Sequence, residues 1–110
     1  MSKFEELKAR IDKEYKAVTN TINVGNNEYL YLWGVLDDLD NIVVELETKV
    51  DYELMSEEEA YESLCMRIKH KLNYLRNVNE CFDNKLPFTF AVGVFFSLTN
   101  LINEIDERNN

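Results

Sequence analysis

The sequence is poor in the residues that interrupt helices and in those that most often carry chemistry. Its 110 residues include one proline, three glycines, one histidine and two cysteines. So little glycine and proline is unusual for a loop-rich or β-rich fold and favours long helices. An apolar content of 45% suffices for one small hydrophobic core. We therefore expect a single all-α domain that spans residues 1–110.

These scarcities also exclude several kinds of active site. The only histidine, His70, has Arg67 three positions before it, so the Glu-x-x-His motif of di-iron bundles is missing. No CxxC, HExxH, Walker loop or GxSxG is present. Cys65 and Cys81 fall on one predicted helix, where a rise of ~1.5 Å per residue places them roughly 24 Å apart, too far for a disulfide. We expect buried free thiols, no catalysis, no metal site and no cofactor.

Long apolar runs are missing as well. The nearest candidate, Leu86 to Leu98, is too short to span a bilayer. No charged leader followed by an apolar segment opens the chain. We therefore expect no membrane association and a cytoplasmic location.

The longest regular pattern runs from Tyr29 to Val50. Its apolar residues recur with spacings of three and four, which places them on one face of a helix. Three heptads with apolar a and d positions are typical of a bundle helix. The seam consists of Tyr29, Leu32, Leu36, Leu39, Val43, Leu46 and Val50.

Three further segments have compatible spacing, so the expected fold is an antiparallel four-helix bundle with helices at about 2–22, 27–52, 57–82 and 87–106. Ser2 with Glu5, and Ser56 with Glu59, are capping-box signatures, and Asn26 or Asn27 is expected to cap the second helix. Residues 88–99 also alternate like a strand, but three long helices leave no partner strand, so we predict a helix there. The seams of these segments are Phe4, Leu7, Ile11, Val18 and Ile22; Tyr61, Cys65, Ile68, Leu72, Leu75, Asn79 and Phe82; and Phe88, Ala91, Phe95, Leu98, Ile102 and Ile105.

The net charge of −9 is unevenly distributed. Residues 37–62 contain eleven acidic residues and one basic residue, Lys49, so this region has a charge of −10 and the remainder +1. Such acidity repels phosphate, and we expect no direct nucleic-acid partner. The alternative to a binding role is an ordinary solvated helix face. The predicted partner-binding residues are Asp37, Asp38, Asp40, Glu45, Glu47 and Asp51.

The helix at 57–82 contains the main concentration of basic residues. One hypothesis is an anion or nucleotide site formed by Arg67, Lys71, Tyr74 and Arg76. No Gly-rich phosphate loop accompanies these residues. The alternative is that they balance the acidic side of the second helix within the bundle.

The helix at 87–106 is apolar on nearly all sides, beyond what one bundle position requires. Either another part of the chain covers its extra apolar residues, or a second copy or a partner does. Small residues would let another helix approach closely. The predicted homodimer interface consists of Phe90, Gly93, Val94, Phe96, Ser97 and Leu101.

A small, acidic, helical protein of this kind is suited to covering a basic surface of another protein, because acidic charge steers association with such surfaces. The leading hypothesis is an inhibitor or neutraliser, by analogy of size and charge with immunity proteins, antitoxins and phage anti-defence factors. The alternatives are a self-associating scaffold protein and a bundle that binds a small ligand or nucleotide.

Overall fold

The computed structural model describes residues 1–25, 27–81 and 86–109, and the side chains of residues 79–81, 86 and 87 lie outside this description. Within these ranges the chain forms four α-helices and no strand, which confirms the predicted all-α four-helix bundle. Residues 88–99 are helical. The last two members of the third predicted seam, Asn79 and Phe82, lie outside the described side chains. The helices are α1 (Lys3–Asn23), α2 (Leu30–Asp51), α3 (Glu57–Cys81) and α4 (Leu86–Arg108), and a short 3-10 turn, η1 (Asn27–Tyr29), precedes α2.

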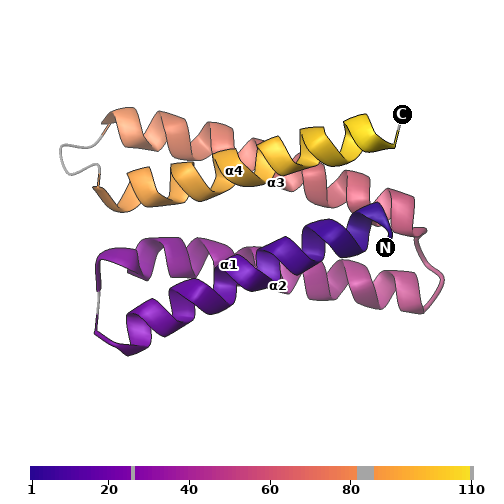
Figure 1. Cartoon of the computed structure of the whole chain (residues 1–110), viewed down its shortest axis with the longest axis horizontal. Helices are drawn as coiled ribbons and strands as arrows, with labels where there is room; N and C mark the ends of the chain where they lie inside the picture. Colours follow the sequence, from indigo (N-terminus) through magenta and orange to yellow (C-terminus); the bar gives the residue numbers. More distant parts are fainter. Residues whose placement is uncertain (26, 82–85, 110) are drawn as a thin grey trace.

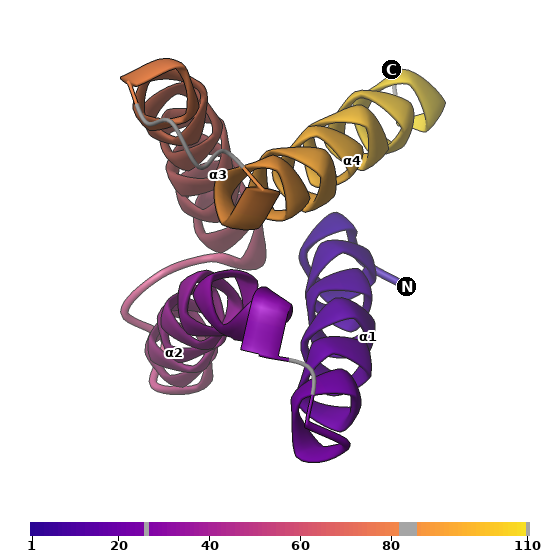
Figure 2. The same ribbon diagram turned by 90° about the vertical axis from the view of Figure 1, so that its left-hand side faces the viewer.

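The helices are arranged as two antiparallel pairs. Figure 1 shows α1 beside α2 and α3 beside α4, with both termini and the α2–α3 connection at the same end of the molecule. Figure 2, along the long axis, shows α2 next to α3 and α1 next to α4. Consecutive helices therefore run in opposite directions, and the molecule measures 44 × 27 × 22 Å.

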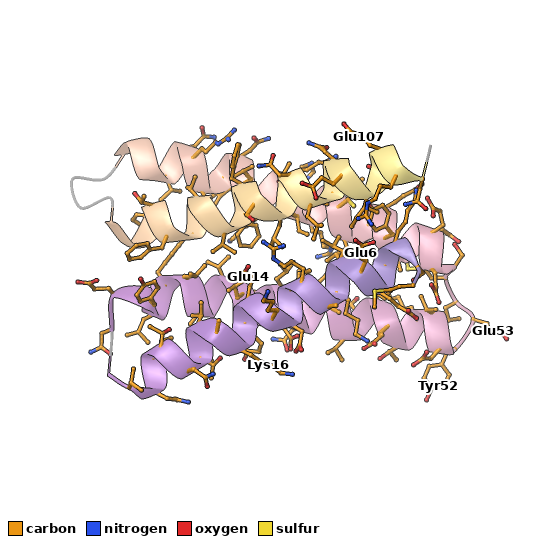
Figure 3. All side chains as sticks on the ribbon, in the orientation of Figure 1. Glu6, Glu14, Lys16, Tyr52, Glu53 and Glu107 are labelled. Carbon is orange, nitrogen blue, oxygen red and sulfur yellow. The ribbon has the colours of Figure 1, made fainter. Side chains whose placement is uncertain are left out.

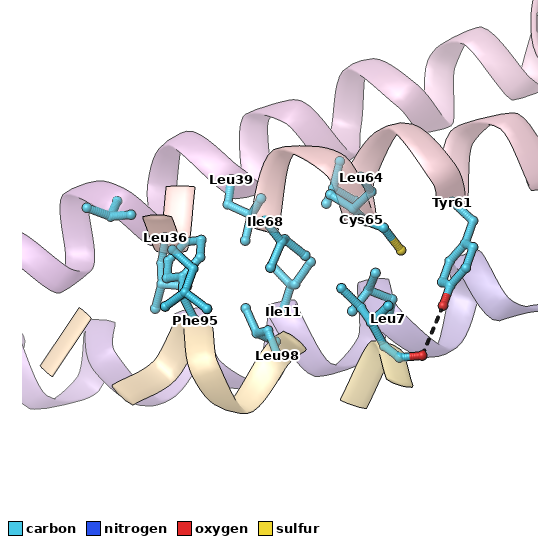
Figure 4. Close-up of a cluster of buried hydrophobic side chains, with 14 of the residues drawn as sticks. Leu7, Ile11, Leu36, Leu39, Tyr61, Leu64, Cys65, Ile68, Phe95 and Leu98 are labelled. Atoms are coloured by element: carbon cyan, nitrogen blue, oxygen red, sulfur yellow. Dashed lines mark hydrogen bonds between the residues drawn. The ribbon is translucent and has the colours of Figure 1, made fainter. Parts of the chain in front are cut away.

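A single hydrophobic cluster with residues from all four helices fills the centre. Among its members, Leu36, Ile68 and Phe95 are at most 1% exposed, and Figure 4 shows them side by side with residues of α1. Each such side chain contributes about 1.5–3 kcal/mol by leaving water. These are seam residues of three different helices, so the heptad spacing predicted the centre of the core correctly. The seam residues nearest the ends of the bundle, Ile22, Tyr29, Val50 and Phe88, are only partly buried.

Two polar groups of α3 enter this core, the Tyr61 hydroxyl, which is hydrogen-bonded, and the Cys65 thiol, which is protonated. The buried Tyr61 donates its hydroxyl proton to Asp106 Oδ1 at 2.8 Å, and burial together with this bond raises the pKa of Tyr61. Burial also raises the pKa of the Cys65 thiol, which keeps it protonated and unreactive. The prediction of a buried free thiol is confirmed for Cys65.

The start of α2 differs from the prediction. Tyr29 belongs to η1 rather than to α2 and is only partly buried. It occupies the N-cap position without a side-chain cap hydrogen bond, so capping of α2 by Asn27 was wrong, and Asn26 lies outside the described residues. The Tyr29 ring instead stacks on Phe90, with 4.5 Å between ring centroids, which places it between the ends of α2 and α4.

Both predicted capping boxes form hydrogen bonds at the helix starts. At α1, Ser2 Oγ accepts from the Glu5 amide at 3.1 Å. At α3 the exchange is reciprocal, because Ser56 Oγ accepts from the Glu59 amide at 3.0 Å and a Glu59 carboxylate oxygen accepts from the Ser56 amide at 3.2 Å. The box at α3 satisfies two amides of the first turn, whereas the box at α1 is half formed, because among the described residues Ser2 caps one amide and the Glu5 carboxylate returns no bond.

One face of α4 is fully buried in the bundle. By length and composition alone, its residues 88–108 would suffice to cross a membrane, so the prediction that no segment is long enough to span a bilayer was wrong. Here the buried face packs against the other three helices, and this compact fold is compatible with a soluble protein. The buried residues are Ala91, Phe95, Leu98, Ile102 and Ile105.

Candidate functional site

The predicted acidic surface of α2 is divided between two sides of the helix. On the side that faces α1, Asp37 Oδ1 accepts a hydrogen bond from the Tyr15 hydroxyl at 2.6 Å. This bond, more than burial, raises the pKa of Tyr15 to about 12. Glu47 forms an ion pair with Lys8 of α1. These two carboxylates therefore join α2 to α1.

Asp40 lies on the same side as these two carboxylates. It is partly buried and lines a surface hollow shared with Lys8, Asp12 and Glu47. Burial first, and then the negative charges of Asp12, Asp37 and Glu47, raise the pKa of its carboxyl. The local environment thus opposes the charged form of Asp40.

The remaining predicted acidic residues point elsewhere. Asp38 is exposed and lines a groove between α2 and α3. Glu45 pairs with Lys49 one turn along α2, at 3.3 Å. Asp51 is exposed at the end of α2. Successive helical residues are rotated by about 100°, so the six residues do not come together on one face.

Exposed acidic residues do gather where α2 connects to α3. We call residues 51–59 the acidic turn; its carboxylates belong to Asp51, Glu53, Glu57, Glu58 and Glu59, all exposed. Two large apolar side chains lie among them, Tyr52 at 74% and Leu54 at 77% exposure. Figure 3 shows Tyr52 and Glu53 projecting from the end of the bundle.

The sequence predicted a binding role for Asp51 and a capping box at Ser56 and Glu59, but the prediction did not include Tyr52 and Leu54. A usable signal was present, because Leu54 follows the end of the α2 seam and precedes the Ser56 cap of α3, so neither helix offers it a buried position.

The backbone of the acidic turn is fixed by hydrogen bonds at the end of α2. The Glu53 amide donates to the Val50 carbonyl at 3.0 Å, and the Leu54 amide donates to the Lys49 carbonyl at 2.9 Å. This pair of bonds defines a Schellman motif. Its left-handed position, usually glycine, is here Glu53 with φ of 59°. An L-residue in this conformation costs about 1–2 kcal/mol.

The other end of the turn is fixed by the Ser56–Glu59 capping box described above. Between the two motifs, Met55 is partly buried and packs against the core. The side chains of Tyr52 and Leu54 are therefore held outward on a well-defined backbone, and a rigid presentation lowers the entropy cost of binding.

Three of the four predicted anion-binding residues come together in the groove between α2 and α3. Arg67, Lys71 and Tyr74 line it together with His70, and Lys71 Nζ lies 4.9 Å from the centroid of the Tyr74 ring. The fourth residue, Arg76, does not line the groove. Its guanidinium instead lies 5.5 Å from the centroid of the Phe96 ring of α4.

The predicted interface on α4 is largely covered by the chain itself. Phe90, Val94 and Leu101 are partly buried against the core, and Ser97 Oγ accepts a hydrogen bond from Arg10 at 3.2 Å. The two exposed members are Gly93 and Phe96, the latter at 48%. Self-association through α4 stays a prediction.

Comparison of the chain with protein-family models, curated proteins and solved structures finds no match. The fold defines the class of the protein, a four-helix bundle. Its distinguishing surfaces are the acidic turn at one end and the groove between α2 and α3.

Proposed function

We propose that this protein binds another protein and inhibits or neutralises it by covering a basic surface, without catalysis of its own. The observation that carries the proposal is the pair of exposed apolar side chains, Tyr52 and Leu54, held among carboxylates on a doubly fixed turn. Exposed apolar side chains that are rimmed by polar residues are typical of protein–protein interaction sites.

The chemistry of the acidic turn indicates the kind of partner. Tyrosine and other large side chains at the centre of an interface supply most of the binding energy when they enter a pocket that excludes water. Carboxylates around them steer a basic partner and accelerate its association. The expected partner therefore has an apolar pocket with lysine or arginine side chains at its rim, and a cytoplasmic location goes with this proposal.

The strained backbone at Glu53 also supports a binding role. Glycine in this position would remove the strain, yet the chain has a glutamate there. Strain that is retained at an exposed position is a reason to look for function at that position. Glu53 stands between the two apolar residues in the sequence and adds a negative charge to the acidic turn, where a basic rim would meet it.

The experiment is capture of partners from host lysate with the full chain, followed by affinity measurements with variants. Tyr52→Ala combined with Leu54→Ala should weaken binding by about 2 kcal/mol or more, roughly thirtyfold. The same substitutions should change stability by no more than about 0.5 kcal/mol, because both side chains are exposed. High salt should slow association.

The matched control is Val24→Ala combined with Leu30→Ala. These exposed apolar residues lie near the α1–α2 connection, at the opposite end of the bundle, and binding should be unaffected. The proposal fails if no basic protein is recovered, or if the captured protein binds the Tyr52 and Leu54 variant as well as it binds the natural chain.

A further inference from the structure

The groove between α2 and α3 is built from two helix faces that oppose each other. Arg67, His70, Lys71 and Tyr74 follow the spacing i, i+3, i+4, i+7, so they form one face of α3. The residues of α2 that line the groove, at 35, 38, 39 and 42, follow the same spacing. Each helix therefore forms one side of the groove. We call these two sets of residues the α3 wall and the α2 wall.

The two walls differ in chemistry. The α2 wall is apolar apart from Asp38, since Val35, Leu39 and Ile42 make up the rest of it. Phe95 of α4, which is almost fully buried, completes the inner side. The groove is open to solvent along its length and has a volume of about 380 Å³, while sites for small molecules span about 300–1,000 Å³.

The basic groups of the α3 wall lie apart from the carboxylates of residues 1–25, 27–78 and 88–109. Among the residues that the structure describes, no carboxylate oxygen lies within 4 Å of Arg67, His70 or Lys71. Most basic residues of α1, in contrast, pair with carboxylates. In a chain of net charge −9, the groove thus retains positive charge that is available to a ligand.

We propose that this groove binds a small amphipathic monoanion, an alkyl or aryl group that carries one carboxylate. The apolar part lies along Ile42 and the Tyr74 ring, the lining residues whose apolar side chains stay accessible, and the carboxylate lies between Arg67 and Lys71. An arginine and a lysine together provide charge-assisted hydrogen bonds to such a group. The apolar group and the carboxylate can both be bound at once because the apolar α2 wall lies opposite the basic α3 wall.

Asp38 selects against more highly charged ligands. Its carboxylate lines the groove on the α2 side, opposite the basic residues. The negative charge of Asp38 repels a ligand with several negative charges more strongly than a ligand with one. The groove therefore suits a carboxylate with an apolar tail better than it suits a nucleotide, and this site is independent of the acidic turn.

The test is a titration of the full ¹⁵N-labelled chain with decanoate, in which the chemical shifts of the backbone amides are measured at each concentration. Saturable shifts should appear at the groove residues. Decyltrimethylammonium, which has the same alkyl chain and the opposite charge, should bind at least about tenfold more weakly, as should inorganic phosphate and ATP. Arg67→Gln combined with Lys71→Gln should weaken decanoate binding by about tenfold or more.

The matched control is Lys13→Gln combined with Lys69→Gln. It removes the same amount of charge from α1 and from a different side of α3, since neither residue lines the groove, and it should leave decanoate affinity within about twofold. All four glutamines suit a helix interior, and circular dichroism verifies folding.

Several results would overturn the proposal. Absence of saturable shifts with decanoate excludes the site. Equal binding of the cationic decyl probe excludes recognition of charge, and tighter binding of ATP or phosphate excludes the monoanion. An equal loss in the control variant would show that only net charge matters. None of these results bears on binding at the acidic turn.

Discussion

The left-handed conformation of Glu53 leads to a prediction that stability can test directly. The residue has φ of 59° in the Schellman motif at the end of α2. Replacement by glycine removes a conformational cost of roughly 1–2 kcal/mol. Glycine also increases the entropy of the unfolded chain, which offsets about 0.4–1 kcal/mol of this gain. Glu53→Gly should therefore raise the free energy of unfolding by about 0.5–1 kcal/mol.

For a domain of this size, a change of 1 kcal/mol shifts Tm by about 4 °C, so the expected increase is about 2–4 °C. Thermal unfolding followed by circular dichroism measures it, and urea titration gives the free energy independently. The variant should still form α2 and α3, because its amide can donate to Val50 as the Glu53 amide does.

Two matched variants separate backbone strain from charge. Glu53→Gln keeps a side chain in the left-handed conformation and removes the negative charge, so it should change stability by less than about 0.5 kcal/mol. The equivalent position at the end of α1 is Gly25, with φ of 94°. Gly25→Glu should destabilise by roughly 1–2 kcal/mol. A Cβ at Gly25 would meet no heavy atom within 4 Å, so this loss would come from the backbone.

The reasoning would be refuted if Glu53→Gly lowered Tm. It would also be refuted if Glu53→Gln raised Tm as much as glycine does, because repulsion among the carboxylates of the acidic turn would then be the cause. If the proposed function is correct, Glu53→Gly should also weaken partner binding while it stabilises the fold. Strained functional sites commonly show this trade-off, in which a more stable variant is less active.

Three further predictions concern the core and the α1–α2 side. Leu36→Ala should cost about 2–5 kcal/mol in urea denaturation, whereas Leu30→Ala, at a position 49% exposed, should cost about 0.5 kcal/mol or less. Asp40→Asn should stabilise the protein at neutral pH. Because the folded-state pKa of Asp40 is raised, the natural protein loses stability as pH rises through that pKa. Below about pH 3.9 the carboxyl is protonated in both the folded and the unfolded state, so the advantage of asparagine should vanish in thermal melts. Tyr61→Phe removes the hydrogen bond to Asp106 and should cost about 1 kcal/mol, measured by urea titration; no loss would show that water replaces this bond.

Much of the fold could be predicted from the sequence because helical periodicity fixes which residues are buried. The seam spacing identified Leu36, Ile68 and Phe95, which are almost fully buried, and Ser56 with Glu59 marked the start of α3. These predictions depend on residues within a few positions of each other, so local geometry suffices for them.

The grouping of the acidic residues could not be predicted in the same way. A run of acidic residues in sequence is divided between two sides of a helix, and the packing of α1 decides what one of these sides contacts. Asp37 meets Tyr15, and Glu47 meets Lys8. The exposed turn that contains Tyr52 and Leu54 was overlooked because periodicity says nothing about residues outside a helical seam.

By itself, the sequence determined the four helices, their buried faces and the basic face of α3, because each follows from spacings of three and four residues. Only the tertiary structure decided which faces oppose each other. Arg67 and Lys71 line a groove because α2 places an apolar face opposite them and α4 closes its inner side with Phe95. That apposition depends on how the helices rotate and pack against one another, and the packing of a whole core sets it rather than any local pattern.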